Sequence, residues 1–122
     1  DIDNFRSIKE NSGYDMADKV VVKVANLFVS YFKSSDYVIR TSQDEFEVFL
    51  IRMQQADSKM LSERISEINQ KLQDSTDGVV AALVSVGIAF SEKGYTTEVE
   101  QKADMALNYV KNKFSSNFFL KR

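Results

Sequence analysis

Two short runs rich in β-branched and aromatic residues, 36–40 and 46–51, are separated by only five residues, which predicts a β-hairpin. The second run is preceded directly by two carboxylates, Asp44 and Glu45. Tight hairpin turns favour Gly or Asn, and neither Ser42 nor Gln43 meets that preference. An acidic pair at this place can hold a hard divalent cation such as Mg²⁺, and the cation can in turn hold phosphates. The hairpin is therefore the candidate functional element.

Helical and extended patterns alternate along the rest of the chain. Helices are predicted over residues 4–10, 15–33, 57–73 and 97–112, and further strands at 1–3, 79–90 and 117–120. Gly13 is expected to end the first helix in a left-handed cap, and Thr97 with Glu100 forms the pattern of a capping box. The run 79–90 is the most apolar, so we expect a buried strand with a kink at Gly87. This order predicts an α/β sandwich with helices against a mainly antiparallel sheet.

Length and charge limit the domain organisation and the partners. With 122 residues, 43% of them apolar, the chain has enough material for one domain, 1–122, and too little for two. It opens on Asp1 rather than Met, which predicts that this domain is excised from a larger multidomain protein. No apolar run reaches the length of a membrane span, so membrane contact by this segment is not expected. A net charge of −2 argues against nucleic-acid binding, which needs a basic face.

The chain contains neither cysteine nor histidine. Thiolate nucleophiles, His-assisted serine nucleophiles and the usual Cys/His zinc sites are therefore excluded. Oxygen-ligated Mg²⁺ with a phosphorylated substrate fits the remaining inventory, and an inert binding or regulatory domain fits it equally well. Absent cysteine is compatible with a reducing compartment, so we expect a cytoplasmic location, either free or as the cytoplasmic part of a membrane-anchored protein.

Several separated segments form one pattern. They are Asp1-Ile2-Asp3-Asn4-Phe5-Arg6, Gly13-Tyr14 followed by Asp18, Arg40 before Asp44-Glu45-Phe46, and the later runs 85–89 and 103–111. Together they resemble the GGDEF family, whose members are diguanylate cyclases or degenerate relatives of them. The resemblance implies a palm-like α/β fold with a ferredoxin-like core, of which the first helix and most of the first strand are missing here. It also implies condensation of two GTP molecules into cyclic di-GMP across a homodimer.

The resemblance implies roles for residues that match the family's motif. They are Asp1, Ile2 and Asp44 for the metal, Glu45 for catalysis, and Asp18, Arg40 and Lys111 for the nucleotide. Ile2 would offer its backbone carbonyl, and Glu45 would bind metal or activate the attacking 3′ hydroxyl. Ordinary roles remain open beside these: Lys111 also suits a helix C-terminus, and Asp18 suits the first turn of a helix.

Other positions depart from the family's pattern. Lys9 stands where the family has an Asn that reads the guanine edge, and an ammonium offers donors only. Ser42 and Gln43 replace both glycines of the signature, although glycine there allows positive φ and a close approach of phosphates. We therefore expect the hairpin to crowd the substrate.

Two further departures, at Ser115 and Lys33, lie at the edges of the implied site. Ser115 falls where an Arg usually contacts phosphate. Lys33 and Asp36 occupy a product-inhibition Arg-x-x-Asp motif, which helix-end and turn chemistry also explains, and Lys lacks the planar fork of Arg.

The retained carboxylates hold the ion, whereas the changed positions shape and identify the substrate. We therefore favour a catalytically weak or silent signalling module that binds GTP or relays a signal through dimerisation. Sensor or effector domains attached to it in the full-length protein are its expected partners. A working diguanylate cyclase and a purely structural dimerisation or partner-binding domain are the alternatives.

Overall fold

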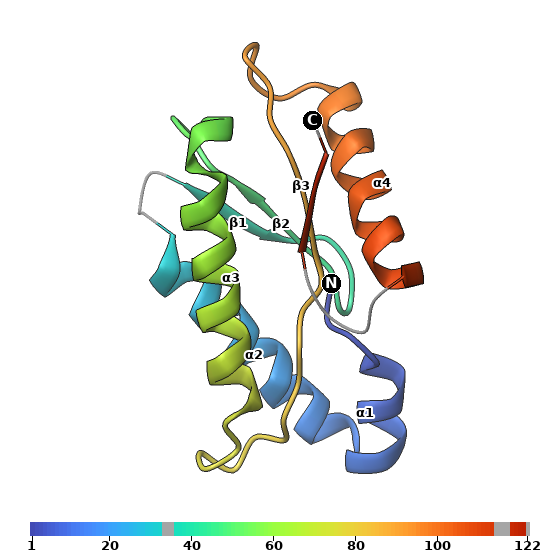
Figure 1. Ribbon diagram of the computed structural model, residues 1–122. Coiled ribbons are helices and arrows are strands. Elements are labelled where there is room, and N and C mark those ends of the chain that lie inside the picture. Colours follow the sequence, from blue (N-terminus) through green and yellow to red (C-terminus); the bar gives the residue numbers. More distant parts are fainter. Residues whose placement is uncertain (33–35, 114–117, 122) are drawn as a thin grey trace.

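The computed structural model describes residues 1–32, 36–113 and 118–121 (Figure 1). The elements are α1 (Phe5–Ser12), α2 (Tyr14–Tyr31), β1 (Tyr37–Arg40), β2 (Phe46–Phe49), the 3-10 helix η1 (Gln55–Asp57), α3 (Ser58–Gln73), β3 (Val86–Ala89), α4 (Thr97–Lys113) and β4 (Phe118–Lys121). Strands β1 and β2 form the antiparallel hairpin, and β3 pairs in parallel with β4. This α/β architecture confirms the predicted fold class. None of the described helices combines the length and the apolar character that a membrane crossing requires.

Residues 1–3 run between the two strand pairs and connect them. Ile2 and Val84 form an isolated antiparallel bridge, and the amide of Ser85 donates to the carbonyl of Asp1 at 2.9 Å. Toward the hairpin, the amide of Ile2 donates to the carbonyl of Asp44, also at 2.9 Å. The Ile2 side chain is 1% exposed, so burial of an apolar group fixes this segment. The carboxylate of Asp1 is thereby placed next to the hairpin.

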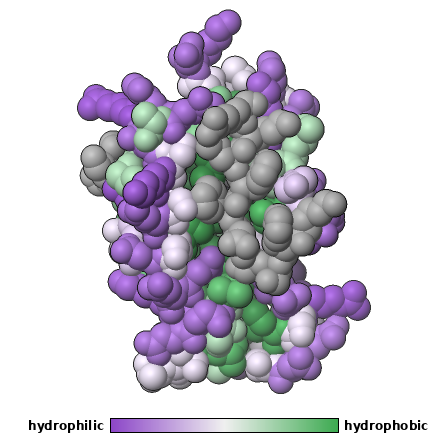
Figure 2. Space-filling view, viewed as in Figure 1, coloured by the Kyte–Doolittle hydropathy of each residue, from purple (hydrophilic) through white to green (hydrophobic). Residues whose placement is uncertain are grey.

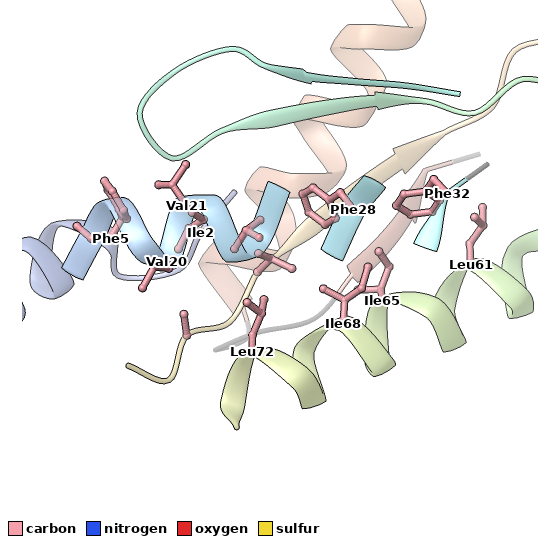
Figure 3. Close-up of a cluster of buried hydrophobic side chains, with 14 residues drawn as sticks. Ile2, Phe5, Val20, Val21, Phe28, Phe32, Leu61, Ile65, Ile68 and Leu72 are labelled. Atoms are coloured by element: carbon pink, nitrogen blue, oxygen red, sulfur yellow. The ribbon is translucent and has the colours of Figure 1, made fainter. Parts of the chain in front are cut away.

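The hydrophobic core lies between α2, α3 and the extended chain that leads into β3 (Figure 3). Its members on the two helices lie on one face of each helix, mostly three or four residues apart, as a one-sided apolar stripe requires. They are Ala17, Val20, Val21, Val24 and Phe28 on α2 and Leu61, Ile65, Ile68 and Leu72 on α3. Hydrophilic residues cover most of the left-hand side of Figure 2, where α3 presents its outer face. Both stripes confirm the helical periodicity read from the sequence.

The core also holds the start of β2. The rings of Phe28 and Phe46 meet edge to face, with centroids 5.5 Å apart and planes at 82°. Such pairs stabilise beyond the area that they bury. Phe46 follows Asp44 and Glu45 directly, so the two carboxylates emerge from a strand that is anchored in the core.

The strand predicted over 79–90 is shorter than the sequence indicates, because only β3 and the bridge at Val84 have strand partners. Before β3 the extended chain is bonded by side chains of α3. The amide group of Asn69 donates to the Val84 carbonyl at 3.1 Å and accepts from the Val84 amide at 2.8 Å. Gln73 donates to the carbonyl of Ala82 at 2.9 Å. Helical side chains thus satisfy backbone groups that a neighbouring strand would otherwise satisfy.

Two helix ends differ from their predicted caps. Gly13 separates α1 from α2 with φ 87° and ψ 165°, a positive-φ conformation outside the left-handed helical region that was expected. The N-cap of α4 is Thr96, one residue before the predicted Thr97, because the Thr96 hydroxyl accepts from the amide of Val99 at 3.1 Å.

Helix α4 lies very close to β3 at Gly87. A Cβ at this position would lie 2.2 Å from the carbonyl oxygen of Ala103 and 2.5 Å from the amide nitrogen of Leu107. The strand is regular here, with Gly87 opposite Phe119 of β4. The glycine therefore serves the close approach of α4, and the predicted kink is not needed to explain it.

Candidate functional site

Three carboxylates meet where the N-terminal segment reaches the hairpin. Asp1, Asp44 and Glu45 each offer one oxygen, and these oxygens lie within 4.8 Å of one another. The Asp1 side chain is 8% exposed, and its Oδ1 is buried without a hydrogen-bond partner among the described residues. A buried oxygen without a partner is costly, and a divalent cation would supply one. The all-oxygen donor set suits Mg²⁺, so these residues fit the implied metal.

Lys111 extends this cluster from the far end of the chain. Its ammonium, on α4, forms an ion pair with Oδ2 of Asp1, the oxygen opposite the unpartnered one. The Lys111 side chain remains 36% exposed, so its remaining donors are accessible to a ligand. The structure thus brings together four residues that the resemblance assigns to the metal, to catalysis and to the nucleotide, with Ile2 beside them.

Arg40 bonds to the hairpin turn itself. Its Nε donates to the carbonyl of Ser42 at 3.0 Å, and its Nη2 donates to the carbonyl of Gln43 at 2.7 Å. The amide of Thr41 donates to the carbonyl of Glu45 at 2.9 Å and closes the turn. Neither Ser42 nor Gln43 has positive φ, so this turn does not need the glycines of the family signature. The resemblance assigns Arg40 to the nucleotide, whereas here its guanidinium positions the turn.

Two of the changed positions contact each other. The Nζ of Lys9 donates to Oε1 of Gln43 at 3.0 Å, and the same ammonium lies 5.3 Å from the centroid of the Phe5 ring. This bond joins α1 to the hairpin turn, one residue before Asp44. Sequence reasoning names both residues but misses their contact, because 34 positions separate them. The one sequence signal that could have pointed to this contact is that Lys9 and Gln43 both depart from the family's pattern.

The remaining predicted site residues lie elsewhere or outside the described ranges. Asp18 is exposed near the start of α2 and does not belong to the three-carboxylate cluster. The Oδ1 of Asp36 accepts from the amide of Ile51 at 3.1 Å, which ties the two ends of the hairpin together. Lys33 and Ser115 lie outside the residues that the structure describes, so their roles stay predictions.

A second acidic group, which sequence reasoning missed, joins β2 to α4. Burial raises the pKa of Glu47, and the charge of Glu100, with which Glu47 shares a side-chain hydrogen bond, raises it further. The charges of Asp104 and Glu45 act in the same direction. The Tyr95 hydroxyl also hydrogen-bonds the carboxylate of Glu100. No local sequence pattern reveals this group, because its members come from β2 and α4.

Substituting Glu47 with Gln should stabilise the fold at neutral pH and not at acidic pH. Since the pKa of Glu47 is raised in the fold, its contribution to stability is present below its unfolded pKa and is lost as the pH rises through its folded pKa. Gln keeps a neutral hydrogen-bonding group at every pH. We expect a higher melting temperature at pH 7 and an unchanged one at pH 4, measured by circular dichroism. Glu63→Gln on the exposed side of α3 is the control. A melting temperature at pH 7 that does not rise would contradict this.

Comparison with known proteins identifies the family. The family model described as "Diguanylate cyclase, GGDEF domain" matches residues 1–117. The diguanylate cyclase DosC of Escherichia coli strain K12 is 31% identical over 116 residues, which are 93% of this chain and 25% of DosC. The chain therefore spans about a quarter of that relative's length.

Solved structures agree with this assignment. The GGDEF domain of TpbB, also called YfiN, from Pseudomonas aeruginosa has a TM-score of 0.84 at 26% identity, covering 100% of this chain and 73% of that one. The GGDEF domain of DgcB from Caulobacter crescentus, solved in complex with c-di-GMP, has the same fold, with a TM-score of 0.81 at 22% identity over 98% of this chain and 73% of that one. The chain belongs to the GGDEF family of diguanylate cyclase domains.

Proposed function

We propose that this chain is a nucleotide-binding GGDEF domain of cyclic di-GMP signalling, which binds GTP together with Mg²⁺ and has weak or no cyclase activity. The observation that carries the proposal is the cluster of Asp1, Asp44 and Glu45, in which one buried oxygen of Asp1 lacks a partner among the described residues. The altered substrate end beside this cluster supports the second half of the proposal.

The metal end of the site keeps the residues that the family resemblance assigns to it. Asp1, Asp44 and the carbonyl of Ile2 would hold the ion, with Glu45 beside it. A bound Mg²⁺ would offset phosphate charge and lower the pKa of an oxygen nucleophile. The ammonium of Lys111 is already held at Asp1, where it adds a positive charge for phosphate oxygens.

The substrate end differs in chemistry. Lys9 offers donors only, so it cannot reproduce the paired donor and acceptor of an amide. Gln43 adds a side chain at the turn and bonds to Lys9 at 3.0 Å. Correct orientation of the bound nucleotide supplies a large share of catalysis, so a misplaced guanine slows the reaction even with the metal in place. Binding would therefore survive better than turnover.

A working cyclase is the second candidate, because all three acidic residues of the cluster are retained. DosC is a diguanylate cyclase, and the DgcB domain was solved with c-di-GMP. Cyclic di-GMP joins two nucleotides, so its synthesis would need a second copy of the domain. Attached sensor or effector domains of a longer protein would supply the signal.

The test uses the full-length protein with GTP and Mg²⁺. We expect GTP to bind only when Mg²⁺ is present, measured by calorimetry. We expect cyclic di-GMP to form at least about a hundredfold more slowly than with DosC assayed in parallel, since lost orientation alone can cost this much. Turnover comparable to DosC would establish the cyclase and overturn the proposed weak activity. Absence of GTP binding with Mg²⁺ would favour the purely structural role.

A further inference from the structure

A cavity of about 320 Å³ lies beside α1. Its walls are one side of α1 and the extended chain over 80–83 that leads into β3. Figure 2 shows apolar atoms reaching the surface low in the view, where Figure 1 places that chain beside α1. None of the residues that line this cavity is one that the family resemblance assigns to the metal or the nucleotide. The cavity is therefore a second candidate binding site, separate from the proposed nucleotide site.

A buried carboxylate lines this cavity. Asp3 is 9% exposed, and its Oδ1 accepts from the hydroxyl of Ser85 at 2.6 Å, which holds the side chain in place. The other oxygen, Oδ2, is buried and has no hydrogen-bond partner in the described part of the chain. No described cation forms an ion pair with Asp3 either. A buried charge without a donor or a counter-ion is costly, so a ligand that brings both would be favoured here.

The neutral side chains of the cavity also offer acceptors. The amide nitrogen of Asn11 donates to Oγ of Ser7 at 3.1 Å, which leaves its oxygen available. The amide nitrogen of Gln73 donates to the carbonyl of Ala82 at 2.9 Å, with the same result. Among the described residues that line the cavity, Asp3 alone carries a charge. The cavity is thus rich in oxygen acceptors and has a negative charge that no lining residue offsets.

We propose that this cavity binds a guanidinium group carried on an aliphatic chain, with Asp3 as its counter-ion. A guanidinium has five N–H donors in one plane, so it can bond Oδ2 of Asp3 and neighbouring neutral oxygens together. Three apolar side chains of the lining, Ile8, Val80 and Leu83, suit the aliphatic part. The exposed Asn4 side chain makes no hydrogen bond within the described residues, so it can turn aside to admit the ligand. The proposal goes beyond the proposed function, because it requires neither GTP nor Mg²⁺.

The first test compares two small ligands on the full-length protein. n-Butylguanidinium and n-butylurea have the same aliphatic chain and nearly the same shape, and only the first is charged. We expect n-butylguanidinium to bind about tenfold more tightly, which is the difference between a charge-assisted and a neutral hydrogen bond. Ligand-observed NMR titration measures both affinities. Equal affinities of the two ligands, or no binding of either, would overturn the proposal.

Variants then locate the binding. Asp3→Asn removes the charge and keeps an oxygen for the Ser85 hydroxyl, so the two ligands should bind it about equally. Ala81→Trp puts a large side chain on the exposed wall of the cavity, so it should abolish binding of both ligands and leave the melting temperature near that of the parent. Asp15→Asn, an equal charge change on the first turn of α2, should bind both ligands as the parent does.

The cluster of Asp1, Asp44 and Glu45 is the competing site for a cation. Undiminished n-butylguanidinium binding in Asp3→Asn would overturn the proposal, and loss of binding in Asp44→Asn instead would place the cation at that cluster. Undiminished binding in Ala81→Trp would show that the ligand does not enter the cavity. If Asp3→Asn does not fold, the result with Ala81→Trp decides alone.

Discussion

Replacing Gly87 with Ala is expected to destabilise the domain by about 3 kcal/mol, at the upper end of the overpacking range. The new Cβ would lie 2.2 Å from the Ala103 carbonyl oxygen and 2.5 Å from the Leu107 amide nitrogen. Both are backbone atoms of α4, so no side-chain rotation relieves the clash and the helix must move as a unit. Urea unfolding followed by circular dichroism measures the loss.

The matched control is Gly94→Ala in the loop before α4. Gly94 has φ 78°, and a Cβ added there would meet no atom within 4 Å. Its substitution therefore costs only backbone strain, roughly 1 kcal/mol. Equal losses in the two variants would show that α4 does not press on β3 at Gly87. The two glycines thus separate packing from conformational strain.

Moving α4 should also disturb the site. Lys111 lies one helical turn beyond Leu107 and reaches Asp1 only because α4 lies against β3. Folded Gly87→Ala protein should therefore bind GTP with Mg²⁺ more weakly than Gly94→Ala protein. This links a packing contact to the phosphate end of the proposed site.

Helices with several turns of regularly spaced apolar residues were predictable from the sequence. The stripe from Leu61 to Leu72 determines α3, because four large apolar side chains on one face can be buried only as a helix against a core. The strand that includes β3 was predicted too long. Its apolar sequence is the same whether the backbone bonds to a neighbouring strand or to side-chain amides of a helix. Asn69 and Gln73 supply those bonds from a separate helix, and no local pattern reveals them.

The candidate site divides in the same way. The resemblance named Asp1, Asp44 and Glu45, and the fold brings their oxygens together, although metal binding itself stays a prediction. The contact between Lys9 and Gln43 could not be predicted, because it depends on how two long side chains cross between α1 and the turn. A family resemblance tells which positions form a site, but it does not predict the contacts that side chains differing from the family's pattern make at those positions.

Substituting Asp44 with Asn is expected to weaken Mg²⁺-dependent GTP binding by at least about a hundredfold, since changes in the residues that merely support metal ligands already cost tenfold to a hundredfold. Asn preserves the shape of the side chain and removes its charge. The hydrogen bond from Ile2 uses the main-chain carbonyl of residue 44, so it should survive and keep the hairpin in place. Calorimetry of GTP at several Mg²⁺ concentrations measures the effect.

A second readout separates lost metal binding from lost folding. In the absence of Mg²⁺, the clustered carboxylates of Asp1, Asp44 and Glu45 repel one another, so Asp44→Asn should unfold at the same or a higher temperature than the parent protein. Added Mg²⁺ should raise the melting temperature of the parent and not of the variant, because a ligand stabilises only the state that binds it. Asp15→Asn, an equal charge change on the first turn of α2, should retain the Mg²⁺ response. A Mg²⁺ response in Asp44→Asn equal to that of the parent would show that Mg²⁺ binding does not depend on the Asp44 carboxylate, and would contradict the proposed metal site.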